Sequence, residues 1–322
     1  MQAKSLLNML VRRKTAEALD ICSFDLVSTD DVSLPAFAAG AHIDVHLPNG
    51  LTRQYSLCND PTESNRYLIC VLSDPESRGG SRFMHESVSE GDKLFVSAPK
   101  NHFALAHGVK RSLLLAGGIG ITPILCMAER LTIADEDFEL HYSARSRARM
   151  AFHDYIQRSK FADKTAFHFS DGDAVQRLHI DTLLSVQQAG THLYVCGPKR
   201  FMDAVLGRAR AIGWPEQHLH YEFFVGLAPS HDADGPFEVK LASSGKVVHV
   251  AKHRTVVEAL ADAGVKVQTS CEQGVCGTCL TRVLEGEPDH RDMFLSPSEQ
   301  AANDQFLPCC SRARSMQLVL DL

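Results

Sequence analysis

The sequence predicts a multidomain protein in which an antiparallel β-barrel domain precedes an α/β doubly wound domain and a small α+β domain. Three observations support this order. The chain has 322 residues, more than one hydrophobic core usually organises. Short strand-like segments broken by turns run over residues 15–107, and strands then alternate with helices over 111–225. Near the C-terminus, three cysteines and two glycines crowd into SCEQGVCGTCLTRV.

The first domain, residues 1–107, has all-β character. Its apolar segments are separated by the turn sequences PNG, NDP and EGD, and we expect the strands to close into a barrel. One strand, RQYSLCND, carries Arg53, Tyr55 and Ser56, and a Gly-Gly-Ser turn follows at residues 79–81. Arginine offers a bidentate fork for phosphate, tyrosine a flat face for stacking, and the turn a set of N–H groups for phosphate. Without further evidence, Arg53 and Tyr55 could equally be a pair of surface side chains that bind no ligand.

The second domain, residues 108–225, contains a strand, a glycine turn and a helix in RSLLLAGGIGITPIL. Gly117, Gly118 and Gly120 let the backbone bend tightly, and the helix expected to start near Pro123 presents its N-terminus to a phosphate. The motif lacks part of the dinucleotide fingerprint, so a strand–helix turn that binds no ligand remains an alternative interpretation.

A second segment, YVCGPKRFMDAV, places Cys196, Gly197 and Pro198 at the carboxyl end of the last strand of this domain. Ligands of open α/β sheets bind at that edge. Two such segments on one edge predict a dinucleotide site.

The segment GLAPSHDADGP, residues 226–236, is small, polar and rich in turn formers, which predicts a linker. In the third domain, residues 237–322, we expect a hairpin around Ser244 and Gly245 and a short helix capped by Thr255. The cysteine loop and a final strand, MQLVLDL, complete it.

The cysteine loop reads C-x4-C-x2-C, and further cysteines, Cys309 and Cys310, begin thirty positions after Cys279. This is the plant-type spacing for a [2Fe–2S] cluster. Four thiolates must converge on two irons, and Gly274 and Gly277 allow the close backbone approach that this requires. A structural zinc usually takes two separated knuckles and fits this spacing less well. Spacing alone leaves the fourth ligand open between the two adjacent cysteines.

The composition limits the partners. The formal charge is −6 and the pI about 6.2, so the chain lacks the excess of Lys and Arg that nucleic acid requires. The N-terminal segment has no signal-peptide pattern, and no run of 18 apolar residues occurs. We expect a cytoplasmic protein that binds neither nucleic acid nor membrane.

Together these segments resemble the phthalate dioxygenase reductase family of flavin-dependent iron–sulfur reductases over essentially the whole chain. The resemblance rests on RQYSLCND, RGGS, SAPKNHF, LLAGGIGITPIL, YVCGPKRFMDAV, HYEFF, SCEQGVCGTC, DHRDMFLS, CCSRA and LVLDL, in that order. It implies an FMN-binding barrel at 1–107, an NAD-binding domain at 108–225, and a β-grasp-like plant-type [2Fe–2S] ferredoxin domain at 237–322. FMN is expected rather than FAD, since no separate adenosine-binding signature is present.

The resemblance also implies site residues. Those for FMN are Arg53, Tyr55, Ser56, Gly79, Gly80 and Ser81. Those for NAD are Gly117, Gly118, Gly120, Thr122, Pro123, Cys196, Gly197 and Pro198. Thr122, Cys196, Gly197 and Phe224 would lie around the nicotinamide and the flavin. The C-x-S-R-A pattern favours Cys309 as the fourth ligand beside Cys271, Cys276 and Cys279. No catalytic acid or base is expected, because the cofactors carry the chemistry.

The nucleotide preference depends on the end of the second strand, where NADH sites usually carry an acidic residue. Here the chain reads HYSARSRARMAFHD, and Arg145 and Ser146 are expected near the adenosine ribose. Arginines there could accept a 2′-phosphate, but relatives with similar stretches commonly use NADH, and we expect NADH rather than NADPH.

The implied function is transfer of a hydride from NADH to FMN and then of single electrons through the cluster to a Rieske-type oxygenase or O-demethylase. The chain has no C-x-H…C-x-x-H pair, so the oxygen chemistry would lie in a separate partner protein. A stand-alone reductase of small acceptors is the alternative, and exposure around Gln273, Gly274 and Val275 would favour a protein acceptor. A non-catalytic redox sensor fits less well, because the flavin and nucleotide motifs are intact. We expect a monomer.

Overall fold

The computed structural model describes residues 6–75, 77, 79–185, 189–224 and 234–322. The chain divides into two compact units, Met1–Glu222 and Phe223–Leu322. The expected linker at 226–236 lies outside the described residues except for 234–236. No helix in the described ranges is long and apolar enough to cross a membrane.

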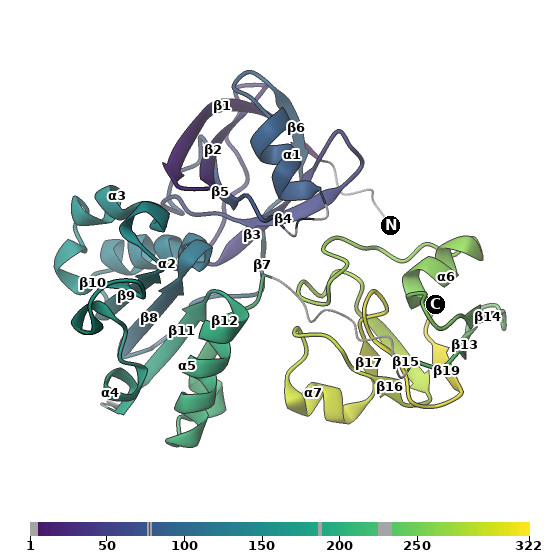
Figure 1. Cartoon of the computed structure of the whole chain (residues 1–322). Coiled ribbons are helices and arrows are strands. Elements are labelled where there is room, and N and C mark those ends of the chain that lie inside the picture. The colour runs from purple at the N-terminus through teal and green to yellow at the C-terminus, as the bar shows by residue number, and fades with distance from the viewer. Residues whose placement is uncertain (1–5, 76, 78, 186–188, 225–233) are drawn as a thin grey trace. The chain divides into compact units, whose positions relative to one another are not determined.

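The first unit begins with a seven-stranded antiparallel sheet in the order β4-β3-β6-β1-β2-β5, with β7 paired to β3 (Figure 1). Beyond the end of β4, Leu57 forms an antiparallel bridge with Ile69 of β5, so the two edge strands meet. The strands are β1 (Leu7–Ala18), β2 (Ile21–Ser28), β3 (Ala41–His46), β4 (Thr52–Ser56), β5 (Tyr67–Leu72), β6 (Lys93–Val96) and β7 (Lys100–Asn101). Helix α1 (Gly80–Ser87) follows β5.

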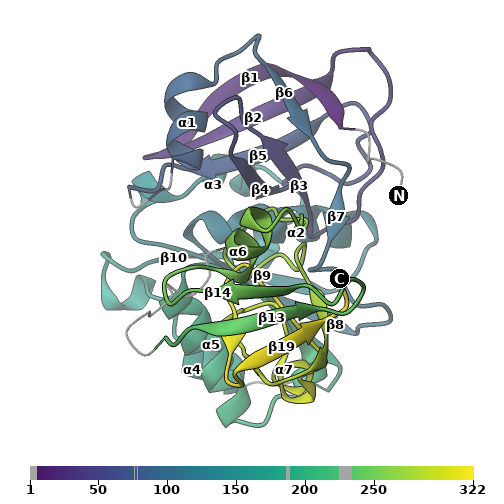
Figure 2. The ribbon, with the colours of Figure 1, turned by 90° about the vertical axis from the view of Figure 1, so that its right-hand side faces the viewer.

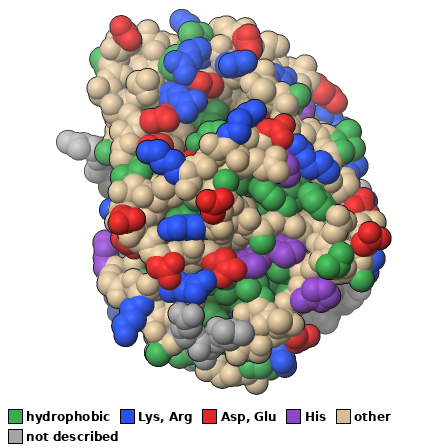
Figure 3. Space-filling view, turned by 90° about the vertical axis from the view of Figure 1, so that its left-hand side faces the viewer, with side chains coloured by type: hydrophobic (Ala, Val, Ile, Leu, Met, Phe, Trp, Pro, Cys, Tyr) green, Lys and Arg blue, Asp and Glu red, His purple; other side chains and the backbone are tan. Residues whose placement is uncertain are grey.

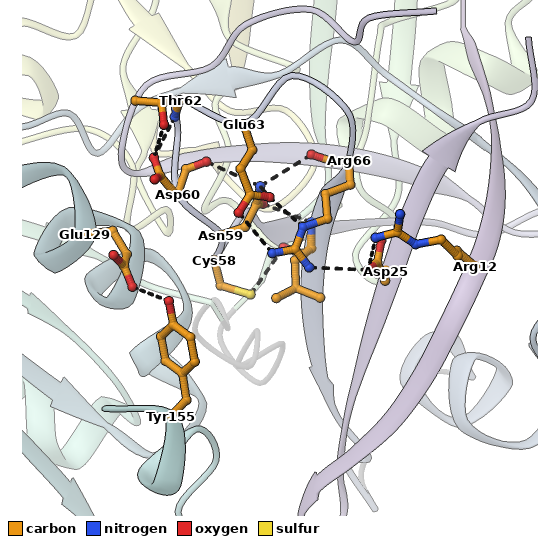
Figure 4. Close-up of polar contacts among 11 residues, drawn as sticks. Arg12, Asp25, Cys58, Asn59, Asp60, Thr62, Glu63, Arg66, Glu129 and Tyr155 are labelled. Atoms are coloured by element: carbon orange, nitrogen blue, oxygen red, sulfur yellow. Dashed lines mark hydrogen bonds and ion pairs between the residues drawn. The ribbon is translucent and has the colours of Figure 1, made fainter. Parts of the chain in front are cut away.

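The loop after β4 is held by a network of charged side chains (Figure 4). Arg66 donates to Glu63 at 2.5 Å and to Asp25 at 3.3 Å, and Arg12 donates to Asp25 at 2.6 Å. Asn59 Oδ1 accepts from Leu68 N at 2.9 Å. These contacts fix the chain immediately beyond the R-x-Y-S segment.

The rest of the first unit is a five-stranded sheet in the order β10-β9-β8-β11-β12, with every neighbouring pair parallel. Its central strand β8 is almost wholly buried, as its apolar run requires. The strands are β8 (Arg111–Gly117), β9 (Phe138–Ala144), β10 (Thr165–Phe169), β11 (Thr191–Cys196) and β12 (Leu219–Glu222).

Helices connect these strands. The α-helices are α2 (Ile121–Ile133), α3 (His153–Gln157), α4 (Ile180–Ser185) and α5 (Lys199–Ala211). Single 3-10 turns are η1 (Gly118–Gly120), η2 (Arg147–Arg149), η3 (Ala162–Lys164), η4 (Ala174–Gln176) and η5 (Glu216–His218). On the face drawn in Figure 3, acidic and basic side chains are intermixed.

The second unit contains a five-stranded sheet in the order β14-β13-β19-β15-β17, and Figure 2 shows β14, β13 and β19 side by side. Only the β13–β19 pair among these is parallel. The strands are β13 (Phe237–Leu241), β14 (Val247–Val250), β15 (Thr281–Glu285), β17 (Gln305–Phe306) and β19 (Gln317–Leu320), and β16 (Pro288–Asp289) pairs with β18 (Arg312–Ala313). The helices are α6 (Val256–Asp262) and α7 (Pro297–Ala302).

Two local predictions for this unit are confirmed. The β13–β14 hairpin turns at Gly245, whose φ is 69°. Thr255 caps α6, since its hydroxyl accepts from Glu258 N while the Glu258 side chain accepts from Thr255 N. Val239, Leu260 and Leu318 are fully buried in the core beneath the sheet.

Candidate functional site

Arg53 on β4 lies directly against the N-terminus of α1. A Cβ added at Gly80 would sit 2.5 Å from Arg53 Nε, so the side chain crosses a position that only glycine leaves open. Gly79 precedes the helix with a φ of 93°, a conformation that favours glycine. A guanidinium beside the free N–H groups of a helix start is a chemically suitable phosphate site.

Two other expected FMN residues flank this site. Tyr55 is half-buried on β4, and burial raises the pKa of its hydroxyl, which keeps the ring neutral. Ser81, in the first turn of α1, accepts a hydrogen bond from Asp74 N at 3.2 Å. The structure therefore gathers residues from β4 and α1 at one place in the first unit.

The glycine turn and the Cys196–Pro198 segment are in direct contact. Strands β8 and β11 are parallel neighbours, so both turns lie at the same edge of the sheet, as predicted. A Cβ at Gly120 would overlap the carbonyl of Cys196, and one at Gly197 would lie 3.0 Å from the Gly117 Cα. Only glycines allow the two turns to approach this closely.

Helix α2 begins at Ile121, two residues before the expected start near Pro123. Thr122 and Pro123 are both buried in its first turn. The Thr122 hydroxyl donates to the Ile119 carbonyl at 3.1 Å and so braces the turn. Pro198 occupies the position immediately before α5, and its Cδ would be 3.0 Å from a Cβ at Gly117. Gly118 takes a φ of 52° at the centre of the turn.

The sites on β4 and on the parallel sheet are joined through Glu222, at the end of β12. Ser56 Oγ donates to Glu222 Oε2 at 3.4 Å, and Glu222 is the register partner of Cys196. Burial raises the pKa of Glu222 from 4.5 to about 8, opposed by the Ser56 hydrogen bond. Burial also raises the pKa of Cys196, and the nearby Glu222 adds to this. At neutral pH, Glu222 is therefore a protonated acid, Cys196 is a thiol and Ser56 is a neutral hydroxyl.

Glu222 is not among the residues expected from the sequence. It lies in the segment HYEFF, in which the aromatic residue Phe224 is the one expected near the flavin. An acidic residue at the carboxyl end of the last strand of an α/β sheet is the signal that could have found it. Phe224 itself belongs to the second compact unit.

Arg145 and Ser146 follow β9, at the same sheet edge. Arg147 is engaged by Asp154 at 2.6 Å and Arg149 by Asp20 at 3.1 Å. Arg145 is exposed, and its guanidinium has no ion-pair partner among the described residues.

In the second unit, the four expected ligand thiols are all buried and lie two by two. Cys271 donates a hydrogen bond to Cys276, and Cys279 donates to Cys309, which lowers the pKa of each accepting sulfur. In the described part of the chain, no group of three or more His, Cys, Asp or Glu side chains is arranged to hold a single metal ion. Two pairs of thiols are the donor set that a two-iron cluster needs, since each iron takes two protein ligands.

The backbone of this loop is folded tightly around the thiols. Gly274 and Gly277 have φ values of 72° and 67°. A Cβ at Gly277 would overlap the Phe294 ring, and one at Gly274 would overlap Cys310 Sγ. Gln273 N donates to Cys271 Sγ at 3.3 Å. Backbone donors to sulfur and a loop that only glycine can close fit a [2Fe–2S] cluster.

Known proteins are similar to this chain along its whole length. The model of the 2Fe-2S iron-sulfur cluster binding domain matches residues 239–314, and that of the dimethylamine monooxygenase subunit DmmA-like N-terminal domain matches 97–219. A vanillate O-demethylase oxidoreductase from a Pseudomonas species is 52% identical over 98% of this chain and 100% of its own. A tetrachlorobenzoquinone reductase from Sphingobium chlorophenolicum is 41% identical over 99% and 98%.

A solved structure of phthalate dioxygenase reductase, described as a modular structure for electron transfer from pyridine nucleotides to [2Fe–2S], matches with a TM-score of 0.77. It is 39% identical and the match covers 99% of this chain and 98% of that one. The chain therefore belongs to the phthalate dioxygenase reductase-like family of oxidoreductases, which join flavin and NAD reductase-like domains to a 2Fe-2S ferredoxin domain.

Proposed function

We propose that the chain passes electrons from NADH through FMN and a [2Fe–2S] cluster to the Rieske-type terminal oxygenase of an aromatic O-demethylase. The observation that carries this proposal is the contact between three separate segments in one unit: Ser56 of β4, Cys196 of β11 and Glu222 of β12. A hydride donor and a hydride acceptor need such a junction. The vanillate O-demethylase relative, at 52% identity, supports the demethylase partner.

The residues divide by cofactor. The FMN phosphate is assigned to Arg53 and the start of α1, and the flavin ring to Tyr55 and Ser56. The other FMN residues are Gly79, Gly80 and Ser81. The NAD residues are Gly117, Gly118, Gly120, Thr122, Pro123, Cys196, Gly197 and Pro198, with Arg145 and Ser146 near the adenosine ribose and Phe224 near the flavin. The cluster ligands are Cys271, Cys276, Cys279 and Cys309.

When bound, the flavin accepts two electrons as a hydride and returns them singly, and the cluster carries one at a time. The protein's own task at the junction is electrostatic. Because the pKa of Glu222 is about 8, its carboxyl holds a proton at neutral pH and brings no negative charge beside the incoming hydride. Cys196 is fully buried and excludes water from the same place.

The finer features of the architecture belong to the same proposal. They are a closed β-barrel at 1–107, a doubly wound sheet at 108–225, a linker at 226–236 and a β-grasp-like ferredoxin domain at 237–322. We also place the protein in the cytoplasm as a monomer.

A second candidate function is reduction of a small acceptor such as a quinone without any protein partner. The tetrachlorobenzoquinone reductase relative, at 41% identity, favours it. The two functions differ in their need for the cluster, because a flavin alone can reduce a quinone.

The test is reconstitution with a vanillate-type Rieske oxygenase under air, with NADH or NADPH as donor. The proposal predicts extractable FMN, a preference for NADH, and demethylated product formed in proportion to NADH consumed. Rapid quinone reduction with no product from the oxygenase would favour the second function. Extracted FAD, or a preference for NADPH, would contradict those parts of the assignment.

A further inference from the structure

A fifth cysteine, Cys310, adjoins the cluster loop. Its Sγ packs on Gly274, where it fills the place that a Cβ would take. The N–H of the same Gly274 donates to the Cys309 sulfur. Two neighbouring thiols thus border one residue of the loop, between the ligands Cys271 and Cys276.

The Cys310 thiol is hydrogen-bonded to the sulfur of Cys309, the expected fourth ligand. Its other hydrogen bonds run to the Leu307 carbonyl and to Ser311 Oγ, each at 3.7 Å, which is long even for sulfur. The side chain is half-buried. The turn beneath it is closed by backbone hydrogen bonds to Leu307 from Cys310 at 3.2 Å and Ser311 at 2.9 Å. The Cys310 sulfur therefore already lies within hydrogen-bond reach of the sulfur that it would replace.

The other three ligand positions have no such neighbour. Cys271, Cys276 and Cys279 are each flanked by non-cysteine residues. The cysteines outside the loop and turn are all in the first unit: Cys22, Cys58, Cys70, Cys126 and Cys196. A spare thiol is therefore available only at the fourth position.

We propose that Cys310 is a reserve ligand that binds the cluster iron when Cys309 is not available. The inference rests on the proposed [2Fe–2S] cluster. Adjacent Cα atoms are 3.8 Å apart, a shift that a turn and a rotated side chain can absorb together. The exchange needs no oxidant: the Cys310 sulfur forms an iron–sulfur bond as the bond from Cys309 breaks, and the Cys310 proton passes to the Cys309 sulfur, or to water where residue 309 has no thiol.

The experiment compares alanine variants of the full chain, because alanine cannot bind iron whereas serine can. Cys276→Ala is the matched control, since it removes a ligand that has no neighbouring thiol. The readouts are iron and sulfide per chain, the visible spectrum, and the EPR spectrum after dithionite reduction. C309A is expected to keep about half or more of the wild-type iron with shifted g-values, while C276A and C309A/C310A fall below about a tenth.

Two results would overturn the inference. In the first, C309A loses its iron as completely as C276A, while Cys309→Ser keeps a cluster with an oxygen-ligand signature and so shows that the loop still folds. In the second, C310A loses the cluster and C309A keeps the wild-type EPR spectrum, which makes Cys310 the ordinary ligand. A wild-type chain without iron would overturn the cluster assignment itself.

Discussion

The two functional regions of this molecule are built in opposite ways. In the second unit, three of the four ligand cysteines lie within nine residues, Cys271–Cys279, and the loop makes its own site. In the first unit, the junction takes Ser56, Cys196 and Glu222 from strands that are far apart in the sequence. One site is encoded locally, and the other exists only when two sheets have folded.

This difference predicts which substitutions should affect which cofactor site. A local loop fails when its own backbone is altered, because its glycines and thiols touch one another. An assembled site fails when a contact between distant segments is altered. Variants of either region should therefore change one cofactor and leave the other.

The largest effect is expected for Arg53→Ala. Removing a charge-assisted donor to phosphate costs about 2 kcal/mol, or roughly 30-fold in FMN affinity. Quenching of FMN fluorescence during titration of the flavin-free protein measures it. Arg111→Ala is the control, since Arg111 pairs with the exposed Asp137 and the half-buried Glu139. Unchanged FMN affinity in R53A would contradict the assignment of Arg53 to FMN. A loss of cluster iron in R53A would contradict the independence of the two sites.

Gly120→Ala should raise the KM for NADH about tenfold with FMN retained. The added Cβ overlaps the Cys196 carbonyl, and forcing the two turns apart costs about 1–3 kcal/mol. Stopped-flow measurement of flavin reduction against NADH concentration gives the value. Gly207→Ala makes the same change within α5, where a Cβ meets nothing within 4 Å. Equal kinetics in the two variants would contradict the assigned nucleotide site.

Gly277→Ala should lower cluster content several-fold while NADH still bleaches the flavin. The matched variant is Gly245→Ala, because φ is similar, 69° against 67°, but a Cβ at 245 meets open space. Strain from a positive φ costs about 1 kcal/mol in both, so only the overlap with Phe294 separates them. Iron per chain measures the difference. If both variants lose iron equally, backbone strain and not close packing governs the loop.

The last prediction concerns Glu222 and pH, and its effect is on stability and not on cofactor binding. Its folded-state pKa of about 8 lies above the ordinary 4.5, so the folded state binds this proton more tightly. The stabilisation is full below pH 4.5 and is lost as the pH rises through 8. Relative to Glu222→Gln, the wild-type Tm should fall as the pH rises from 5 to 8.5. Parallel Tm curves would show that Glu222 is not buried as an acid.

Much of the organisation follows from sequence patterns alone. The glycine turn and the Cys196 segment are both strand ends of a parallel sheet, so their shared edge could be predicted from β8 and β11. The hairpin at Gly245 and the Thr255 cap are local and were equally accessible. The cysteine spacing indicates four ligands because the ligands lie close together in the chain.

The junction could not be predicted in the same way. Ser56 and Glu222 are 166 positions apart, and nothing near either residue signals their contact. The raised pKa of Glu222 is a property of burial, which depends on the packing around it. Nor could spacing distinguish Cys309 from Cys310, and in the structure Cys309 is hydrogen-bonded to both Cys279 and Cys310, while Cys310 also packs on Gly274.

Electron transfer from NADH to the cluster is tested most directly by an anaerobic titration of the purified protein with NADH, followed by absorbance and by EPR. We expect bleaching of the flavin together with a rhombic EPR signal from the reduced cluster, with both complete after a small number of NADH equivalents. Bleaching of the flavin with no cluster signal at any NADH concentration would contradict electron transfer between the two units.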